Sequence, residues 1–355
     1  MKPLTALCLI WMLLASCALA ALPAPTVAPH GEATGTGADA SSAQDGDVGN
    51  SAVVAVPDML GLQGAAFHVA LMGEHFDRAG APVTLLPVAN PFAGQTALLD
   101  GKADVAILPV PAVARSVKEP RPLVALGVIT AANPLNFVVA AIVAKERGLL
   151  DRRPFAERMA GLKGLTIGLP QGAIAGQTLA DILDAASLAP GKDVTLLVLP
   201  REELVPALQS GRVQGLVAHH PDVNRAVGEA GAVVVLHTSA GDGPVPTAQP
   251  MAWYVLATTR EYHASHGEAL RRLLLGLQSA QQWVHDDPDA AARLLRPRFG
   301  DLSDAAFAEG VRLYFAAVPV TPLISEDAYR NALRSVRAEV ADFDRAVDNS
   351  LLMLP

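Results

Sequence analysis

Apolar runs of strand length alternate with segments of helical periodicity from residue 52 onward. The first four runs are expected to form strands at residues 53–56, 83–87, 103–108 and 123–128. The helices between them are expected at residues 64–76, 92–99 and 111–117. Near-continuous apolar strands are typical of a mainly parallel sheet with both faces covered. The pattern therefore predicts an α/β lobe at the start of the folded chain.

A second lobe is predicted by the same alternation further along. Its strands are expected at residues 165–169, 194–199, 214–218 and 232–236, and its helices at residues 173–186, 202–209 and 221–230. Two long apolar runs, 136–143 and 251–258, flank this lobe and are expected to form a hinge of two crossing strands. We therefore divide the chain into a first lobe at 52–138, a second lobe at 139–250 and a return to the first lobe at 251–355.

The return segment is predicted to be helical. Leucine, alanine and valine side chains repeat at helical spacing between Leu270 and Val284. Three further helices are expected to begin at Asp287, Ser303 and Ser325, which are typical N-cap residues. We interpret these helices as packing elements.

One stretch of the chain occurs twice without a gap. Residues 97–117 and 207–227 share Ala-Leu, then Gly with a basic residue, an apolar run, and Pro, Val, Arg and Val in register. A second echo, Gln-Gly-Ala, lies upstream of each copy at residues 63–65 and 171–173. The alternative to duplication is chance. Two matched signals in the same order favour two lobes built on one plan.

The first twenty residues have the composition of a secretory signal peptide. Lys2 precedes an apolar run at residues 4–14, which is too short to span a bilayer. Two processing sites compete: Ala20 fits ordinary cleavage, whereas the sequence LASC ending at Cys17 resembles a bacterial lipobox. We favour lipidation of Cys17.

A flexible tether is expected at residues 21–51. This segment consists largely of Ala, Pro, Gly, Thr, Ser and Asp, which bury too little surface to offset the entropy of ordering. A coil of this length has a root-mean-square span of about 30 Å. Such a tether suits a globular part that swings above a membrane anchor at Cys17.

Composition restricts the classes of function. Of the 355 residues, 51% are hydrophobic and 17% charged, which is ample for sizeable cores. The net charge of −8 and the lack of a basic cluster argue against binding to DNA or RNA. Cys8 and Cys17 are the only cysteines, so after processing we expect no disulfide, thiolate nucleophile or cysteine-bound metal.

Three segments resemble a known family, the substrate-binding proteins of ABC importers for sulfonates, taurine, nitrate and thiamine precursors. They are GLKGLTIG at 161–168, ALQSGRV at 207–213 running on to Pro221, and QWVHDDPDA at 282–290. The resemblance covers about residues 53–347. It implies a type 2 periplasmic-binding fold, in which two α/β lobes joined by two crossing strands close on a ligand.

Ligands of open α/β sheets bind beyond the carboxyl ends of the strands, which selects a short set of loops. The candidate ligand-binding residues in and beside these loops are Asp58, Gln63, Gly64, Asn90, Val110, Gly172, Ala173, His219, His220, Asp222 and Trp253. Gly64 and Gly172 either let backbone N–H groups approach a ligand or only permit a tight turn. If residues alternate along the hinge strand, either Trp253 or Tyr254 faces the cleft.

The expected ligand is an uncharged or weakly charged heterocycle or amide-like solute. Relatives often carry Ser or Thr after the glycine that corresponds to Gly172, where this chain has Ala173, and 109–111 offers no hydroxyl. Gln214 replaces a usual Asp, which we interpret as a change in a local turn. The polar side chains near the cleft are mixed rather than cationic, whereas nitrate or a simple sulfonate favours Arg or hydroxyl donors.

No cofactor or metal is expected. His219 and His220 adjoin and point to opposite sides of an extended chain, while His263 and His266 lack a third ligand nearby and are expected to be a solvated pair. Motifs of hydrolases, nucleotide-binding loops and zinc proteases are absent from the sequence. Enzymes of the yeast thiamine-precursor type depend on a cysteine-rich segment, which this chain lacks, so we expect no enzyme.

The sequence thus predicts a periplasmic, membrane-anchored and monomeric solute-binding lipoprotein. Its partners are expected to be a small-molecule ligand and an ABC permease with its ATPase. The alternative is a ligand sensor or interaction lipoprotein that uses the same bilobal fold without transport.

Overall fold

The structure is a computed structural model that describes residues 51–171, 173–244 and 248–353. The expected signal peptide, Cys17, the tether through residue 50, and Gly172 lie outside the described residues. All described residues belong to one compact unit. Across them, every helix is too short or too polar to cross a membrane.

The first lobe is built on a five-stranded sheet of order β2-β1-β3-β10-β4. Its strands are β1 (Ala52–Pro57), β2 (Val83–Val88), β3 (Val105–Pro109), β4 (Leu123–Thr130) and β10 (Tyr254–Thr259). β1 pairs in parallel with β2 and β3, whereas β10 runs antiparallel between β3 and β4. A strand from the return segment therefore completes this sheet.

The second lobe repeats this plan with the order β7-β6-β8-β5-β9. Its strands are β5 (Asn136–Ala140), β6 (Thr166–Pro170), β7 (Thr195–Leu199), β8 (Gly215–Ala218) and β9 (Ala232–Leu236). β5 runs antiparallel between β8 and β9, as β10 does in the first lobe. Two α/β lobes joined by two crossing strands are thus confirmed, and both lobes follow one plan.

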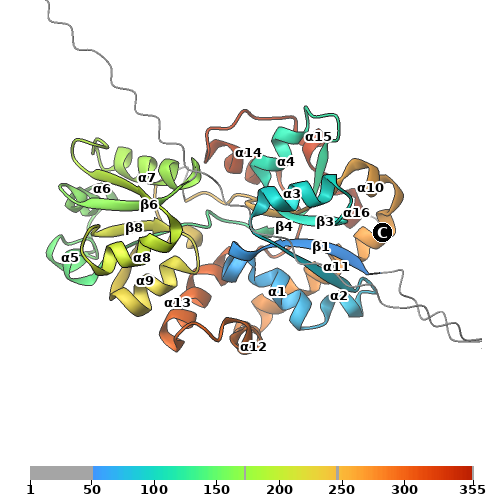
Figure 1. The fold of residues 1–355 in the computed structure, drawn as a ribbon, viewed down its shortest axis with the longest axis horizontal. Coiled ribbons are helices and arrows are strands. Elements are labelled where there is room, and N and C mark those ends of the chain that lie inside the picture. Colours follow the sequence, from blue (N-terminus) through green and yellow to red (C-terminus); the bar gives the residue numbers. More distant parts are fainter. Residues whose placement is uncertain (1–50, 172, 245–247, 354–355) are drawn as a thin grey trace, which may run out of the picture. The chain divides into compact units, whose positions relative to one another are not determined.

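Helices cover both faces of each sheet (Figure 1). The first lobe carries the 3-10 helix η1 (Asp58–Gly64), α1 (Ala65–Met72), α2 (His75–Arg78), α3 (Pro91–Leu99) and α4 (Val110–Ser116). α1 and α2 lie on one side of the sheet, and α3 and α4 on the other (Figure 1). The single helix expected at 64–76 is wrong: α1 ends at Met72 with Gly73 as its C-cap, and Glu74 adopts a left-handed conformation with φ 58° before α2 begins.

The second lobe has the same division of helices. It carries α5 (Ala141–Glu146), α6 (Phe155–Met159), η2 (Ala160–Leu162), α7 (Ala173–Ala185), α8 (Arg201–Gln209), α9 (Asp222–Ala230) and η3 (Thr238–Ala240). α7 lies on one side of this sheet, and α8 and α9 pack together on the other (Figure 1).

The return segment forms the remaining helices. They are α10 (Arg260–Ser265), α11 (Gly267–Asp286), α12 (Pro288–Leu295), η4 (Arg296–Phe299), α13 (Asp304–Tyr314), η5 (Phe315–Ala317), α14 (Glu326–Arg334), α15 (Phe343–Ala346) and α16 (Ser350–Met353). The three expected N-caps are confirmed, because Asp287, Ser303 and Ser325 each accept a hydrogen bond from the backbone N–H three residues later.

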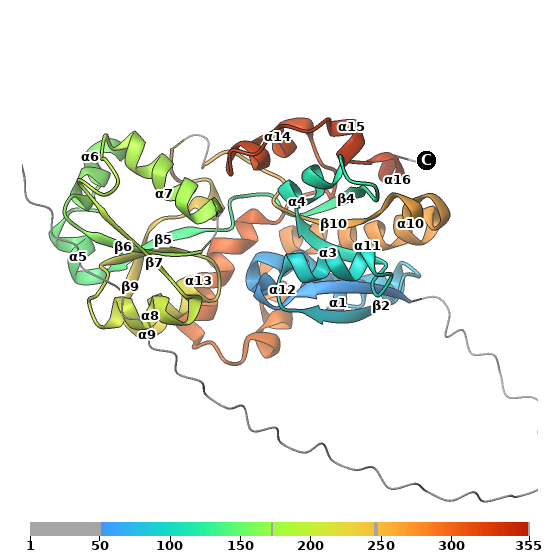
Figure 2. The ribbon, with the colours of Figure 1, turned by 45° about the horizontal axis from the view of Figure 1, so that its top comes forward.

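One return helix, α13, contacts both lobes. It packs against η1 of the first lobe and lies beside α9 of the second (Figure 2). Asn224 Nδ2 in α9 donates a hydrogen bond of 3.0 Å to the carbonyl of Ala306 in α13. The return segment therefore packs against both lobes.

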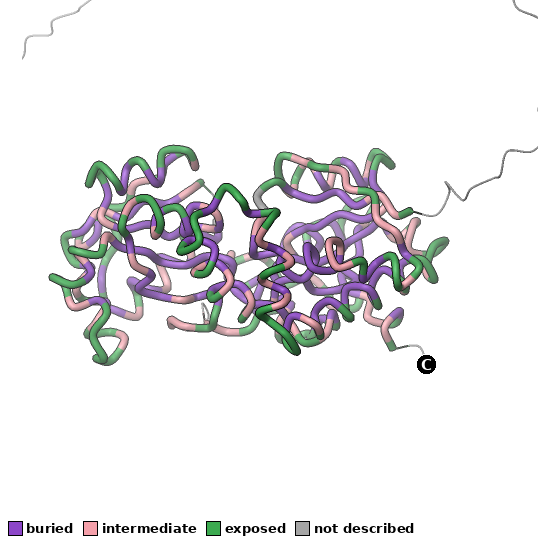
Figure 3. The backbone as a smooth tube through the Cα atoms, turned by 90° about the horizontal axis from the view of Figure 1, so that it is seen from below, coloured by how far each residue is buried: buried purple, intermediate pink, exposed green. Residues whose placement is uncertain are grey.

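The cores lie around the central strands of both sheets (Figure 3). β3, β4 and β8 are almost entirely buried, as their apolar sequences predict. The edge strand β7 differs, since Leu196 is 37% and Val198 55% exposed. These side chains lie at the sheet edge, where β7 pairs with β6 on one side only.

Candidate functional site

The two lobes meet at the carboxyl ends of their strands. Gly61 follows β1 in the first lobe, and His220 follows β8 in the second. A Cβ atom at position 61 would fall 2.1 Å from Cδ2 of His220, so the imidazole rests directly on the Gly61 backbone. This contact places His220 at the junction of the lobes, in one of the loops selected from the sequence.

His220 is a buried, neutral imidazole. Its Nδ1 lies 2.7 Å from Oδ1 of Asn224, and its ring meets Phe299 and Tyr314 edge-on at centroid distances of 5.5 and 6.0 Å. Burial, followed by the charge of Arg201, lowers the pKa of His220 to about 3. His220 therefore fills the junction as an uncharged ring held by Asn224.

An ion pair lies next to this histidine. Arg201 Nε donates a 2.7 Å hydrogen bond to Oδ2 of Asp222, and Arg201 Nη2 donates a 3.0 Å bond to the carbonyl of His220. Burial raises the pKa of Asp222, although the charge of Arg201 acts in the opposite direction. The guanidinium stays partly exposed, with 38% of its side-chain surface accessible.

Sequence reasoning missed Arg201. It directly follows Pro200 at the carboxyl end of β7, so the strand-end rule could have found it. The helix was expected to start at residue 202, whereas α8 begins at Arg201 after the N-cap Pro200. The structure shows that Arg201 links Asp222 to His220, two residues that the sequence did select.

Several buried polar atoms near the junction have no hydrogen-bond partner in the described part of the chain. They include Nδ1 of His219, both ring nitrogens of His68 and Nε1 of Trp253, although the Trp253 side chain also interacts with the phenol of Tyr254. Burial, followed by the charge of Arg201, lowers the pKa of His219 to about 4. The imidazole of His219 is therefore uncharged at neutral pH.

Trp253 is fixed by its backbone at the carboxyl edge of the first sheet. Its carbonyl accepts a 2.9 Å hydrogen bond from the N–H of Val110, and its N–H donates a 2.9 Å bond to the carbonyl of Thr130. The side chains of Trp253 and Tyr254 are both buried and meet edge-on at 6.3 Å. Burial raises the pKa of Tyr254 to about 12, so its phenol stays protonated.

The loop after β1 contributes one buried candidate and leaves another exposed. Gln63 is buried, and its carbonyl accepts a 2.5 Å hydrogen bond from Oγ1 of Thr130. Gly64 is packed under Leu60, because a Cβ at position 64 would lie 2.4 Å from Cγ of Leu60. Asp58 is exposed at the start of η1.

The remaining candidates lie at helix starts. Asn90 is exposed and caps α3, since its Oδ1 accepts a 3.0 Å hydrogen bond from the N–H of Ala93. Val110 is buried as the first residue of α4. Ala173 begins α7, and Gly172 before it lies outside the described residues.

A further buried histidine, His68 in α1, was not selected from the sequence because it lies inside an apolar helical run. Its ring meets Phe299 edge-on at 5.9 Å, and Phe299 also meets His220. Burial, followed by the charge of Arg298, lowers the pKa of His68 to about 3. A layer of neutral imidazole and aromatic rings therefore lies between the lobes.

No cluster of His, Cys, Asp and Glu suited to a metal occurs among the described residues. His263 and His266 are not a solvated pair on one helix face, because α10 ends at Ser265. His263 lies 3.3 Å from the carboxylate of Asp348, and His266 stacks on Tyr262 at 3.9 Å. His266 is exposed as expected, whereas His263 is half-buried against Asp348, so the two rings do not form one solvated pair.

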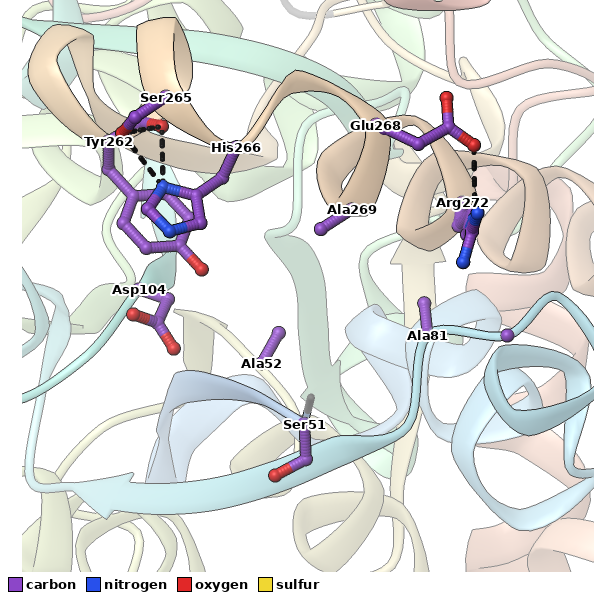
Figure 4. Close-up of a pocket in the computed structure, with 11 residues that line it drawn as sticks. Ser51, Ala52, Ala81, Asp104, Tyr262, Ser265, His266, Glu268, Ala269 and Arg272 are labelled. Atoms are coloured by element: carbon purple, nitrogen blue, oxygen red, sulfur yellow. Dashed lines mark hydrogen bonds and ion pairs between the residues drawn. The ribbon is translucent and has the colours of Figure 1, made fainter. Parts of the chain in front are cut away.

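A cavity of about 490 Å³ lies at the opposite edge of the first sheet. It is lined by Ala52 at the start of β1, Asp104 before β3, and Tyr262 and His266 after β10. Figure 4 shows the stacked Tyr262 and His266 rings above Asp104, with the ion pair of Glu268 and Arg272 to one side. This cavity is remote from the strand ends that the sequence selected.

The sequence matches one known protein family. A family model described as the NMT1-like family matches residues 62–296. No curated protein matches the sequence.

Solved structures share the fold at low sequence identity. The periplasmic aliphatic sulphonate binding protein SsuA from Escherichia coli is 15% identical, with 81% of this chain and 91% of that chain covered and a TM-score of 0.60. A zinc-bound ligand-binding component of an ABC-type import system from Staphylococcus aureus is 13% identical, with coverages of 86% and 98% and a TM-score of 0.63. The desulfurization enzyme DSZB is 17% identical, with coverages of 85% and 98% and a TM-score of 0.58.

Proposed function

Because this chain belongs to the NMT1-like family, we propose that it is an extracytoplasmic solute-binding protein. In this proposal it captures a small organic molecule between its two lobes and delivers it to an ABC permease with its ATPase. The resemblance in fold to binding components of import systems supports the proposal at the level of architecture.

The observation that carries the proposal is the set of buried polar atoms at the junction that lack a hydrogen-bond partner among the described residues, with Nδ1 of His219 foremost. His219 Nδ1 belongs to the second lobe, and Trp253 Nε1 lies at the edge of the first. Buried donors and acceptors are nearly always satisfied in proteins, so unmatched ones at a junction of lobes mark positions where a ligand or a water molecule would bond. A solute that bonds to both atoms would hold the lobes together.

The charges at the junction favour an uncharged or weakly charged solute. Arg201 is the cation that the sequence reasoning missed, but Asp222 already balances it at 2.7 Å. The imidazoles of His219 and His220 are neutral at pH 7 because their pKa values are lowered to about 4 and about 3. A heterocycle or amide-like molecule that stacks on Trp253 and bonds to His219 suits this set.

A thermal-shift panel of sulfonates, nitrate, pyrimidines and flavin-like compounds tests the function. A true ligand at one hundred times its Kd is expected to stabilise the protein by about 2.7 kcal/mol. His219→Ala and Trp253→Phe should reduce this stabilisation, while His266→Ala, in the remote cavity, should leave it unchanged.

Three outcomes would count against parts of this proposal. Stabilisation by taurine or nitrate alone would contradict the uncharged ligand. Unchanged stabilisation in both His219→Ala and Trp253→Phe would contradict the site. Turnover of a stabilising compound by the purified protein would contradict the binding role and favour an enzyme, a function known for the fold from DSZB.

We also propose a periplasmic location with a lipid anchor at Cys17, a signal peptide at 1–20 and a tether at 21–51. The lipobox sequence and the composition of the tether support this arrangement. Metabolic labelling with a fatty-acid analogue in a bacterial host should mark the wild type and not Cys17→Ser. An unlabelled wild type would place cleavage after Ala20 and leave a soluble monomer.

A further inference from the structure

A groove of about 550 Å³ runs between α3 and α4 on the outer surface of the first lobe. Phe92, Leu99 and Ala112 supply its apolar lining, and Arg115 and Arg121 lie along it. Phe92 is 77% exposed, more than any other large hydrophobic residue in the described chain. An aromatic side chain left in solvent beside an apolar groove is a common mark of a binding surface.

The second lobe provides an internal comparison because it follows the same plan. Since Ala97 corresponds to Ala207 in the repeated stretch, Phe92 corresponds to Glu202 and Leu99 to Gln209. There α8 and α9 pack directly on one another, and Gln209 Nε2 donates a 3.3 Å hydrogen bond to the carbonyl of Glu229. The first lobe alone therefore has both an open groove and apolar residues at its edge.

Arg225 and Glu229 of the second lobe correspond to Arg115 and Glu119 of the first, and of these two pairs only the second-lobe one forms an ion pair among the described residues. Arg225 in the second lobe is paired with Glu229, with Nε to Oε1 at 2.9 Å and Nη2 to Oε2 at 3.2 Å. Its counterpart Arg115 is exposed and forms no ion pair with a carboxylate of the described residues. Arg121 donates a hydrogen bond to the carbonyl of Leu99 at the end of α3. The groove thus presents the Arg115 guanidinium outside any ion pair of the described residues, with the Glu119 carboxylate also in the lining.

The position of the groove favours one partner. Phe92 is the second residue of α3, which begins after the carboxyl end of β2. Trp253 lies at the same edge of this sheet, so the Phe92 end of the groove faces the side of the ligand-binding junction, while Leu99 and Arg121 extend the groove toward the opposite edge. A permease that receives the solute must contact the rim of this junction, whereas the cavity near Tyr262 lies at the opposite edge.

We propose that the α3–α4 groove docks an extracytoplasmic segment of the permease that carries a carboxylate next to large apolar side chains. Phe92 and Leu99 pack against the apolar side chains, and Arg115 pairs with the carboxylate. This inference rests on the proposed transport function.

Site-specific photocrosslinking in the native host tests the inference. p-Benzoylphenylalanine is placed at position 92 of the full chain and, as a control remote from the rim, at position 266 beside the cavity at the opposite edge. Mass spectrometry of the crosslinked band is expected to identify a permease subunit at position 92 and not at position 266. With that subunit in nanodiscs, Phe92→Glu and Arg115→Glu should each weaken binding about tenfold or more, and His266→Ala should not.

Crosslinking tests the docking surface, and thermal stabilisation by a solute tests the proposed function independently. A crosslink to a second copy of this chain, no crosslink at position 92, or equal crosslinks at both positions would overturn the docking surface. Phe92→Glu should retain the ligand-induced thermal stabilisation of the wild type. If the wild type is stabilised by a solute and position 92 captures no permease, only the docking surface is wrong.

Discussion

Gly61 of the first lobe lies directly against the imidazole of His220 of the second, with no space for a side chain at position 61. The backbone of Gly61 has φ 49° and ψ −150°, a conformation that is essentially restricted to glycine. Position 61 therefore requires glycine for two reasons: its backbone conformation and the close approach of the other lobe.

Gly61→Ala is expected to separate the lobes. The Cβ would overlap His220, so small-angle scattering should show a larger radius of gyration, and the affinity for a ligand should fall. The backbone strain should lower the free energy of unfolding by about 1–3 kcal/mol. Gly101→Ala is the control, since Gly101 also has positive φ but no atom within 4 Å of a Cβ there. An equal change in scattering for both variants would contradict the role of the contact.

Acid is expected to destabilise the protein through its buried histidines. The pKa values of His68 and His220 are lowered to about 3, so the unfolded chain binds protons that the folded chain does not. Above pH 6.5 these histidines are neutral in both states and do not change the free energy of unfolding. Below pH 6.5 the free energy of unfolding falls by about 1.4 kcal/mol per histidine for each pH unit, until the folded pKa is reached. Denaturant titrations at pH 7 and pH 4.5 measure this loss.

His68→Phe should reduce the acid sensitivity. Phenylalanine keeps an aromatic ring beside Phe299 and cannot take up a proton. The loss of unfolding free energy between pH 7 and pH 4.5 should therefore be smaller in the variant than in the wild type. An identical loss in both proteins would contradict the burial of a neutral His68.

Arg201→Leu is expected to destabilise the second lobe by about 1–2 kcal/mol at pH 7, because it leaves the buried carboxylate of Asp222 unpaired. Without Arg201 the raised pKa of Asp222 rises further, so the penalty should shrink as the pH falls and the carboxylate is protonated. Arg225→Leu, which removes a surface pair, should cost less than about 1 kcal/mol. Equal losses in the two variants, measured by denaturant unfolding, would contradict the importance of burial.

Asn90→Ala is expected to lower the free energy of unfolding by about 1 kcal/mol through loss of the cap of α3. If Asn90 acts only as a cap, the thermal stabilisation by ligand stays unchanged. A loss of ligand-induced stabilisation in the folded variant would instead return Asn90 to the binding residues selected from the sequence.

The sequence predicted those parts of the fold that depend on local chemistry. Ser303 and Ser325 begin helices because a hydroxyl satisfies free N–H groups, a property visible within four residues. The repeated stretches predicted two lobes of one plan, since equal patterns of strand and helix produce equal sheets. The resemblance to the binding-protein family was likewise confirmed by the family match.

Contacts between distant segments were not predictable in this way. α13 packs on the second lobe through a hydrogen bond between Asn224 and Ala306. These residues are far apart in the sequence, and no local pattern around either one predicts the contact. The position of Arg201 at a strand end was visible in the sequence, but its ion pair with Asp222 at the start of α9 was not. The exposure of Val198 also depends on the position of β7 at the sheet edge, which the apolar sequence of the strand does not encode.

The insertion of β10 between β3 and β4 has a consequence for the order of folding. A chain that emerges with its amino terminus first presents β5 to β9 consecutively, so the second lobe can form its sheet as soon as residue 236 is available. The first lobe has to wait for β10, and until then the facing edges of β3 and β4 stay unpaired. The lobe that is made first is therefore completed last, and its open edges are exposed to aggregation or to chaperones during that interval.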